Sequence, residues 1–308
     1  MDAAATDLPD VDSGAVEQVR RFHRIVTQRV GALDDRYLAR DRPLGQARLL
    51  WEIGAGADGG VAIRDLRARL DLDSGYLSRL LRALEADDLV AVGPSEADRR
   101  VRVARLTDRG RTERAVLDER SDALARSLVE PLRPDQRRRL VTAMGEVERL
   151  ITAALVAVAP VDPEDPAAQR CLQRYAAELA TRFEDGFDTG RSRPVDPAGM
   201  RPPEGTFLLA RVHGEAVGCV ALRLRPGPEA EVKRMWVDPA ARGLGVARRL
   251  LDAVEAPARA AGAPALRLDT NRTLVEAIAL YRSAGFVEVP AFNDEPYAHH
   301  WFEKRLEH

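Results

Sequence analysis

The stretch EVKRMWVDPAARGLGVA, residues 231–247, decides how the second half of this 308-residue chain is interpreted. Residues 231–237 indicate a strand, Asp238-Pro239 predicts a turn, and residues 242–247 form a glycine-bearing loop that opens into a helical pattern. Glycine lets backbone approach a ligand closely, and the first N–H groups of a helix have no intrahelical acceptor. The loop is therefore a candidate diphosphate site, although glycines near helix starts are common and the loop alone is weak support.

The segments after the loop place it in a larger pattern. A short strand at residues 265–268 is followed by Asp269-Thr270-Asn271, and a helical run at residues 274–284 ends at Gly285. This order of strand, loop, helix, strand and helix resembles that of the GNAT superfamily of acyl-CoA-dependent N-acyltransferases.

The motif of that superfamily is present in the loop itself. It consists of Arg or Gln, two residues, Gly, one residue, then Gly or Ala, and Arg242, Gly245 and Ala247 fill it here. The segment LYRSAGF, residues 280–286, also stands in family order. The resemblance covers residues 167–308 and implies a mixed α/β fold with a splayed central sheet and acetyl-CoA as acyl donor.

The resemblance also implies which residues hold the donor. Backbone of residues 235–237 is expected to pair with the pantetheine arm, and the amides of residues 242–247 are expected to take the diphosphate. Asn271 is expected to hydrogen-bond the pantetheine arm. The full set of expected donor contacts is Met235, Trp236, Val237, Arg242, Gly243, Leu244, Gly245, Val246, Ala247, Asn271 and Tyr281.

Two residues are candidates for proton transfer. Tyr281 is the candidate general acid because a phenol can protonate a leaving thiolate; the alternative is a core aromatic residue on an amphipathic helix. Glu231 is the candidate general base, since it stands eleven residues before Arg242, as does the catalytic glutamate in the histone-acetylating branch. Its alternative is an exposed carboxylate at a strand end, and many GNAT enzymes use waters and backbone carbonyls instead.

The acceptor amine, of a small molecule or a peptide, is expected to lie between two groups of residues. Phe183 and Phe187 fall in the region that usually roofs this pocket. Lys233 and Arg234 are candidates for holding an acceptor carboxylate, which would suggest an amino-acid-like substrate; strand alternation predicts that at most one contributes. The residues expected in the opposite wall are Asn293, Tyr297, His299, His300 and Trp301.

The first half of the chain has a different pattern. A helix at residues 63–70, a turn, and a helix at residues 74–86 with one leucine face precede two short strands, at residues 89–92 and 101–106. The strands predict a hairpin with a charged tip. Helix, turn, helix and hairpin together predict a winged helix-turn-helix, whose second helix enters a DNA major groove.

The residues of this unit resemble the MarR (multiple antibiotic resistance regulator) family. LDSGYLSRLLRALEADDLV and SEADRRVRVARLTDRG carry the resemblance, which covers residues 16–158 and implies a homodimer on a pseudo-palindromic double-stranded DNA operator. Arg100 is the implied wing-tip arginine, and Asp98 is expected to hold the tip in shape. For Arg79 and Arg82 the alternative is a merely solvated helix face. The expected DNA contacts are Ser74, Tyr76, Ser78, Arg79, Arg82, Arg99 and Arg100.

Two long helices support the dimer. One is expected at residues 16–38, and another follows Pro134 with an apolar stripe at four- and three-residue steps. The stripe consists of Leu140, Met144, Val147, Ile151, Ala154 and Val158. Residues 159–166 are rich in proline and acidic residues and predict a linker, so the expected domains are residues 1–158 and 167–308.

Composition narrows the class of protein. The net charge of −2 gives no global case for nucleic acid, so that case rests on local residues. Cys171 and Cys219, the only cysteines, form no metal cluster, and with the absence of a signal peptide or an apolar membrane-length run they suggest a cytoplasmic protein.

The sequence therefore predicts an α+β chain of two domains, a mainly helical winged helix-turn-helix followed by a GNAT-type domain. Its expected function combines a transcriptional regulator with an acetyl-CoA-dependent N-acetyltransferase acting on a primary amine. One alternative is a pure regulator whose second domain senses acyl-CoA without catalysis. Another is an enzyme whose winged helix serves only to dimerise it.

Overall fold

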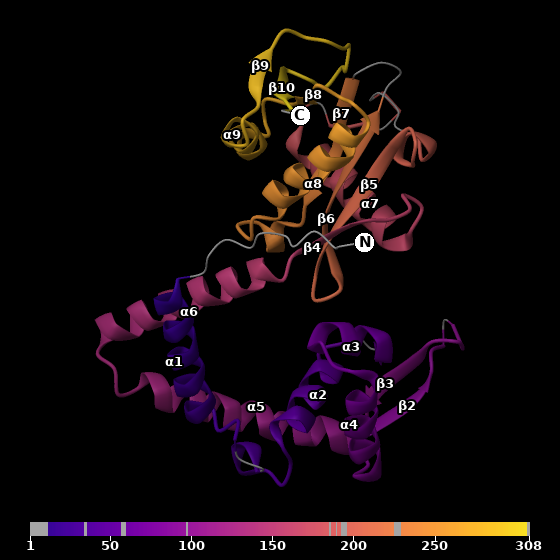
Figure 1. Ribbon diagram of the computed structural model, residues 1–308. Coiled ribbons are helices and arrows are strands. Elements are labelled where there is room, and N and C mark those ends of the chain that lie inside the picture. The colour runs from indigo at the N-terminus through magenta and orange to yellow at the C-terminus, as the bar shows by residue number, and fades with distance from the viewer. Residues whose placement is uncertain are drawn as a thin grey trace, which may run out of the picture. The chain divides into compact units, whose positions relative to one another are not determined.

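The computed structural model describes residues 12–33, 36–56, 60–96, 98–184, 186–188, 190–191, 196–224 and 229–306. The chain divides into two compact units, Met1–Leu140 and Val141–His308 (Figure 1). Helix α6 (Pro134–Ala154) is continuous across this division. The division thus falls earlier in the chain than the predicted linker.

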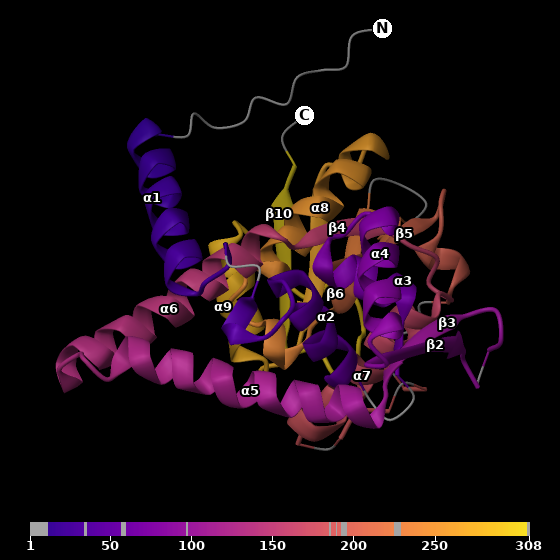
Figure 2. The ribbon, with the colours of Figure 1, turned by 90° about the horizontal axis from the view of Figure 1, so that it is seen from below.

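Within the described residues, the first unit joins helices, including the first turns of α6, to a small antiparallel sheet in the order β1-β3-β2. Its other helices are α1 (Ser13–Arg29), α2 (Leu44–Gly54), α3 (Ile63–Leu70), α4 (Ser74–Ala86) and α5 (Asp108–Val129), with a 3-10 turn η1 (Tyr37–Ala39). Its strands are β1 (Val61–Ala62), β2 (Val90–Pro94) and β3 (Arg102–Leu106). The predicted winged helix-turn-helix is therefore present, as α3, α4 and the β2–β3 hairpin (Figure 2).

Local hydrogen bonds fix the start of α4 and the tip of the hairpin. Asp73 caps α4, since its Oδ1 accepts a hydrogen bond of 2.8 Å from the Tyr76 amide. At the wing tip, Asp98 Oδ1 accepts a bond of 2.9 Å from the Arg100 amide, in the role predicted for it. Ala97 of the same tip lies outside the described residues.

Helix α1 ends at Arg29, well before the predicted end at residue 38. Gly31 has a φ of +68°, and the amides of Gly31 and Ala32 turn back to the carbonyls of Gln28 and Thr27. This is the Schellman arrangement, which glycine favours because it has no Cβ to oppose a left-handed backbone. The predicted helix was too long because this glycine stop was missed; positions 34–35 lie outside the described residues.

The second unit is built on a seven-stranded sheet in the order β4-β5-β6-β7-β8-β10-β9, in which β7 and β8 run parallel and the other neighbours antiparallel (Figure 1). The strands are β4 (Ala157–Pro160), β5 (Gly205–Val212), β6 (Glu215–Leu224), β7 (Glu229–Val237), β8 (Ala265–Thr270), β9 (Val287–Val289) and β10 (His300–Arg305). The helices are α7 (Pro166–Arg182), α8 (Val246–Ala260) and α9 (Val275–Ser283), with short turns η2 (Ala198–Met200) and η3 (Pro239–Ala241).

The two faces of this sheet are covered by different helices. Along β6, Val220 and Leu222 pack with Leu250 of α8, whereas Ala221 between them lies in the core cluster that contains Cys171 of α7. Because side chains alternate between the faces of a strand, α7 and α8 cover opposite faces. The predicted mixed α/β domain is confirmed.

The segment after α6 differs from the prediction. Helix α6 ends at Ala154, and Val158, expected in the apolar stripe of that helix, lies instead in β4. Strand β4 pairs antiparallel with β5, from Ala157 opposite Arg211 to Pro160 opposite Leu208. Pro160 is tolerated there because β4 is an edge strand. The chain thus enters the sheet before the start of the expected linker at residue 159.

The sheet splays between β7 and β8. Their parallel pairing ends at Glu231 opposite Arg267, although β7 continues to Val237 and β8 to Thr270. On the other side of β7, the partner of Ala221 is Lys233 while that of Cys219 is Trp236, so β7 carries an extra residue. This β-bulge includes Arg234, whose φ of +53° is unusual for a residue with a side chain. The predicted splayed sheet is thereby confirmed.

Candidate functional site

A groove of about 550 Å³ runs along the open side of β7 in the second unit. Its walls come from α7, the end of β7, the glycine loop, the start of α8 and α9. The predicted donor contacts that line it are Met235, Trp236, Val237, Arg242, Gly243, Gly245, Val246, Ala247 and Tyr281. Of the remaining two, Leu244 packs against the core and Asn271 lines other cavities.

The glycine loop leaves the start of α8 open to this groove. Gly243 and Gly245 have φ values of +82° and +72°, which residues with side chains rarely adopt. Gly245 is the N-cap residue of α8 and supplies no side-chain cap, so the first amides of the helix keep their hydrogen-bonding capacity. Together with the positive end of the helix dipole, this arrangement fits a diphosphate.

Glu178 of α7 organises the side chains around the loop. It accepts hydrogen bonds from Arg242 at 2.6 and 2.7 Å and from the Trp236 indole at 2.9 Å. Burial acts to raise the pKa of Glu178, but these hydrogen bonds outweigh it and hold the pKa below its ordinary value. Arg242 is thus held by a carboxylate, which leaves backbone amides as the main anion ligands of the loop.

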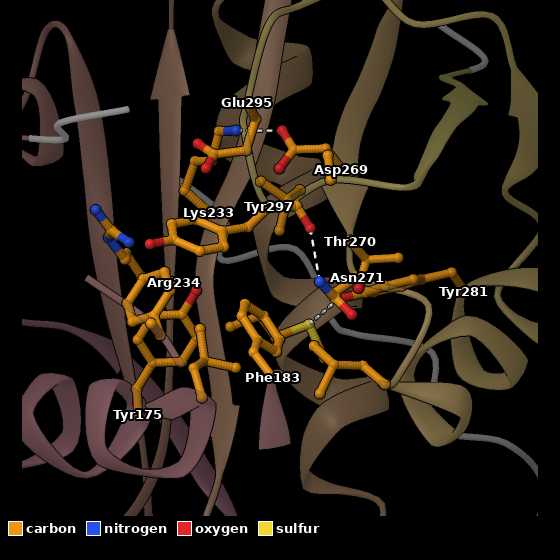
Figure 3. Close-up of a pocket in the computed structure, with 16 residues that line it drawn as sticks. Tyr175, Phe183, Lys233, Arg234, Asp269, Thr270, Asn271, Tyr281, Glu295 and Tyr297 are labelled. Carbon is orange, nitrogen blue, oxygen red and sulfur yellow. Dashed lines mark hydrogen bonds and ion pairs between the residues drawn. The ribbon is translucent and has the colours of Figure 1, made fainter. Parts of the chain in front are cut away.

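A second, smaller cavity of about 80 Å³ lies where β7 and β8 splay apart (Figure 3). The residues that line both this cavity and the groove are Tyr175, Leu179, Met235, Leu274 and Tyr281. The two spaces therefore meet beside Tyr281. A long donor in the groove and an acceptor in the cavity would face each other there.

Tyr281 lies at this junction with only 7% of its surface exposed. Its hydroxyl is 4.0 Å from the Met235 sulfur, and its ring packs against Phe286 and Phe302. Burial raises the pKa of the phenol well above its ordinary value, with smaller contributions from Tyr175 and Asp269. The phenol is therefore a neutral proton donor over the ordinary working range of pH.

Glu231 is placed away from both spaces. It is 2% exposed, and it stands opposite Arg223 of β6 and Arg267 of β8 in the register of the sheet. It does not line the groove or the smaller cavity. Glu231 is therefore not placed to contact an acceptor amine directly in either space.

The Asn271 side chain forms two hydrogen bonds within the protein. Its amide donates to the Tyr297 carbonyl at 2.8 Å (Figure 3), and its oxygen accepts from the Thr273 amide at 3.0 Å. These bonds shape the loop after β8 on the acceptor side of the site.

Lys233 and Arg234 both line the smaller cavity, contrary to the alternation argument. The bulge in β7 is the reason, because the extra residue breaks the two-residue period that would send them to opposite faces. Lys233 forms an ion pair with Asp269 across the opening between the strands (Figure 3). Both side chains of this pair are about nine-tenths buried.

Asp269 is a site residue that the sequence argument missed. Asn293 donates to its carboxylate at 2.9 Å, and Trp301 donates to Asn293 at 2.8 Å. Asn293 and Trp301 thus stand behind the cavity as a second layer rather than lining it. A signal was available, since Asp269 directly precedes Thr270-Asn271 at the end of a strand already assigned to the site.

Aromatic rings form the remaining wall of the cavity. Phe187 lies 5.0 Å from Tyr297 and 6.2 Å from Tyr175 between ring centroids, and Phe183 lies 5.6 Å from Tyr297. Phe183, Phe187 and Tyr297 therefore line the cavity, as expected. The two histidines do not: His299 lines a neighbouring cavity, and His300 pairs with Glu288.

The predicted DNA contacts form the exposed side of α4 and the wing. All seven side chains are exposed, opposite the buried leucines of α4. The Arg79 guanidinium lies 5.7 Å from the centre of the Tyr76 ring, and Arg82 donates to the Ser78 carbonyl at 3.2 Å. Arg99 and Arg100 lie at the tip between β2 and β3.

Within the described ranges, no helix is long and apolar enough to cross a membrane. Among the same residues, no group of three or more His, Cys, Asp or Glu side chains is arranged to hold a metal ion.

Comparison with known proteins identifies both halves. Residues 169–286 match the model of the acetyltransferase (GNAT) family, and residues 41–101 match that of the MarR family. An IAA acetyltransferase of Azospirillum brasilense is 39% identical over 121 residues, covering 39% of this chain and 79% of that protein. An uncharacterized N-acetyltransferase of Schizosaccharomyces pombe is 36% identical over 133 residues, covering 42% and 76%.

A solved structure gives a further match. The crystal structure of a Klebsiella pneumoniae acyl-CoA N-acyltransferase is 30% identical, with a TM-score of 0.43, covering 50% of this chain and 99% of that one. The chain belongs to the GNAT family of acetyltransferases, and its residues 41–101, in front of that domain, match the MarR family.

Proposed function

We propose that the second unit transfers the acetyl group of acetyl-CoA to the primary amine of a small amino-acid-like molecule, and that the first unit binds operator DNA as a transcriptional regulator. The observation that carries the enzymatic half is the meeting of the groove and the cavity at Tyr281 and Met235. The groove of about 550 Å³ includes the open start of α8 for the donor, and the cavity includes the Asp269 carboxylate for an amine.

The proposed reaction runs through a ternary complex. The acceptor nitrogen attacks the thioester carbonyl carbon, the carbon–sulfur bond breaks, and the Tyr281 hydroxyl gives its proton to the departing thiolate. Backbone amides of residues 235–237, next to the bulge, are placed to hold the donor and polarise the thioester carbonyl. Tyr281 recovers a proton from solvent after coenzyme A leaves.

The acceptor must lose a proton before or during attack, and two carboxylates are candidates to help. Asp269 lies on the cavity wall, so we assign it the role of binding the amine and passing its proton to water. Glu231 stays a prediction as the base, and its burial requires that it act through a water relay.

An amino-acid-like acceptor is supported by the charges and rings of the cavity. Asp269 can take an ammonium group, and Arg234, whose guanidinium lies 5.8 Å from the Tyr175 ring centre, can take a carboxylate. The aromatic wall of Phe183, Phe187 and Tyr297 suits an apolar or aromatic side chain. Since both charges line one small cavity, a zwitterion fits it better than an uncharged amine.

The test is thiol release with a panel of acceptors. We expect free aromatic and aliphatic amino acids to release coenzyme A faster than their methyl esters, because the ester lacks the carboxylate that Arg234 would bind. Peptides that present a lysine serve as the competing class. Faster turnover of peptide lysine than of every free amino acid would contradict the proposed acceptor class. Donor binding without any thiol release would leave the domain as a sensor.

Operator binding is proposed from the exposed basic residues of α4 and the wing. A duplex selected from a genomic fragment library by the full-length protein is the probe. We expect Arg100→Ala to weaken binding about tenfold and to reduce the dependence of log affinity on log salt by about one unit, as loss of one phosphate contact does. Arg64→Ala, an exposed arginine of α3, is the matched control. Equal affinity and salt dependence in Arg100→Ala and the wild type would contradict a role for the wing.

A homodimer is proposed from the apolar side chains that two helices expose. On α1 these are Val16, Val19, Phe22, Ile25 and Val26, and on α6 they are Val141, Met144, Leu150 and Ile151. Apolar rows of this length are usually covered by a partner. Sedimentation of the full chain checks this, with a monomer at micromolar concentration as the contrary result. A cytoplasmic location is part of the same proposal.

A further inference from the structure

The end of helix α6 lies against the proposed diphosphate loop. The Arg149 side chain comes so close to Gly243 that its Cδ is 3.8 Å from the position a Cβ would take there. A few residues later, the Val156 carbonyl accepts a hydrogen bond of 2.7 Å from Arg249 of α8. Val156 itself is 7% exposed and packs in the core with Val246, the first residue of α8. All these residues belong to the unit Val141–His308.

The groove has little positive charge to spare for a diphosphate. Three arginines and two glutamates line it near the loop, so the side chains there contribute one net positive charge. Arg242 pairs with Glu178 and Arg182 with Glu276, while Arg248 forms an exposed pair with Asp252 that a phosphate can replace as readily as the pair of Arg149 with Glu146. A donor that carries several phosphate charges would be held better if a further cation stood beside the loop.

Arg149 can provide that cation. It pairs with Glu146 one helical turn earlier, and both side chains are 49% exposed. An ion pair this exposed contributes little free energy, so a phosphate with more charge and more acceptor oxygens can draw the guanidinium away from it. The arginine stem lies beside Gly243 of the loop, although Arg149 does not itself line the groove.

We propose that Arg149 of α6 contacts a phosphate group of acetyl-CoA bound at the glycine loop, so that α6 responds to occupancy of the donor site. The proposal rests on the proposed place of the donor in this groove and goes beyond the proposed function, since it assigns a donor contact to a helix that begins in the winged-helix unit. Helix α6 is unbroken from Pro134 to Ala154 and carries the exposed apolar row offered to a second copy. If binding of the donor orders α6, then by linkage it also favours the state of the protein in which α6 is ordered.

The first test is calorimetric titration of the full-length protein with acetyl-CoA. We expect Arg149→Ala to weaken binding about five- to tenfold, and Arg149→Lys to restore part of the loss because it keeps the charge. Arg138→Ala, an exposed arginine on the same helix away from the loop, should bind within about twofold of the wild type. The loss in Arg149→Ala should shrink as salt rises.

The second test is hydrogen exchange of the same proteins with and without acetyl-CoA. In the wild type we expect amides of residues 146–154 to exchange more slowly when the donor is bound, and in Arg149→Ala we expect this protection to fall. Near-equal affinity of Arg149→Ala and Arg138→Ala, or unchanged exchange in residues 146–154 of the wild type with donor bound, would overturn the inference and leave the donor site standing. If the wild type binds no acetyl-CoA at all, the proposed function fails as well.

Discussion

Tyr281→Phe is expected to lower kcat for acetyl transfer by about 10²- to 10⁴-fold, the usual contribution of a positioned general acid. The phenylalanine keeps the ring that packs against Phe286 and Phe302 and removes only the hydroxyl beside Met235. The affinity for acetyl-CoA should stay within about threefold, because the donor is held mainly by the loop and the backbone of β7. Steady-state thiol release and donor titration measure the two quantities separately.

The pH dependence of the wild type checks the same role. Burial raises the pKa of Tyr281, so the phenol stays protonated above the ordinary phenol pKa of about 10. Because the acid acts in its neutral form, kcat should stay constant as pH rises and fall only when the pH passes the raised pKa of Tyr281. Between about pH 7 and pH 10 we therefore expect no fall in the kcat of the wild type from ionisation of Tyr281. A fall in that range that disappears in Tyr281→Phe would count against this role.

Tyr175→Phe is the matched control for this prediction. Tyr175 is half-buried and also lines both the groove and the cavity, but its ring lies beside Arg234 and Phe187. We expect its loss of hydroxyl to lower kcat by less than about tenfold. A kcat of Tyr281→Phe within about threefold of the wild type would remove the tyrosine from the mechanism.

Asp269→Asn is expected to lower kcat/KM for the acceptor by about 10²-fold, because the amide cannot bind and relay the proton of an ammonium as a carboxylate does. The same change leaves the Lys233 ammonium nine-tenths buried without its counter-ion, and it should lower the free energy of unfolding by about 3 kcal/mol. Acceptor kinetics and urea unfolding of the full chain give the two readouts.

A double variant separates the catalytic effect from the structural one. Lys233→Met with Asp269→Asn removes the stranded charge, so we expect most of the stability to return while kcat/KM stays low. The control for a general effect of charge is Asp294→Asn, which changes an exposed aspartate next to Asn293. Recovery of kcat/KM in the double variant would mean that Asp269 serves only to neutralise Lys233. A larger loss in Glu231→Gln than in Asp269→Asn would return the role of base to Glu231.

Local sequence signals predicted the parts of the fold that local chemistry determines. The glycine loop before α8, the Asp73 cap of α4 and the Asp98 turn of the wing each depend on residues within a few positions of one another. The order of the strands followed from the family resemblance. For these reasons the winged helix and the mixed α/β domain could be named before any coordinates.

The acceptor side could not be predicted in the same way. Whether Lys233 and Arg234 share a cavity depends on the bulge in β7, which is set by pairing with Cys219 and Ala221 of β6. The pairing of Asp269 with Lys233 depends on where β7 and β8 separate. Neither the bulge nor the point of separation can be predicted from the alternation of residues along a strand, because alternation alone predicts a regular ladder.

The segment around residue 159 was also predicted incorrectly from local sequence. Prolines and acidic residues there predicted a linker, yet residues 157–160 add a strand to the edge of the sheet. A short edge strand needs few local signals, because its partner supplies half of the hydrogen bonds. Its position brings the end of α6 next to the loop that we propose for the donor.

A crystal structure of the protein with acetyl-CoA tests the central claim most directly. We expect the diphosphate on the amides of residues 243–247 and the thioester between Met235 and the Tyr281 hydroxyl, facing the cavity that holds Asp269. A donor bound elsewhere, or a thioester sulfur beyond hydrogen-bond reach of the Tyr281 hydroxyl, would contradict the account.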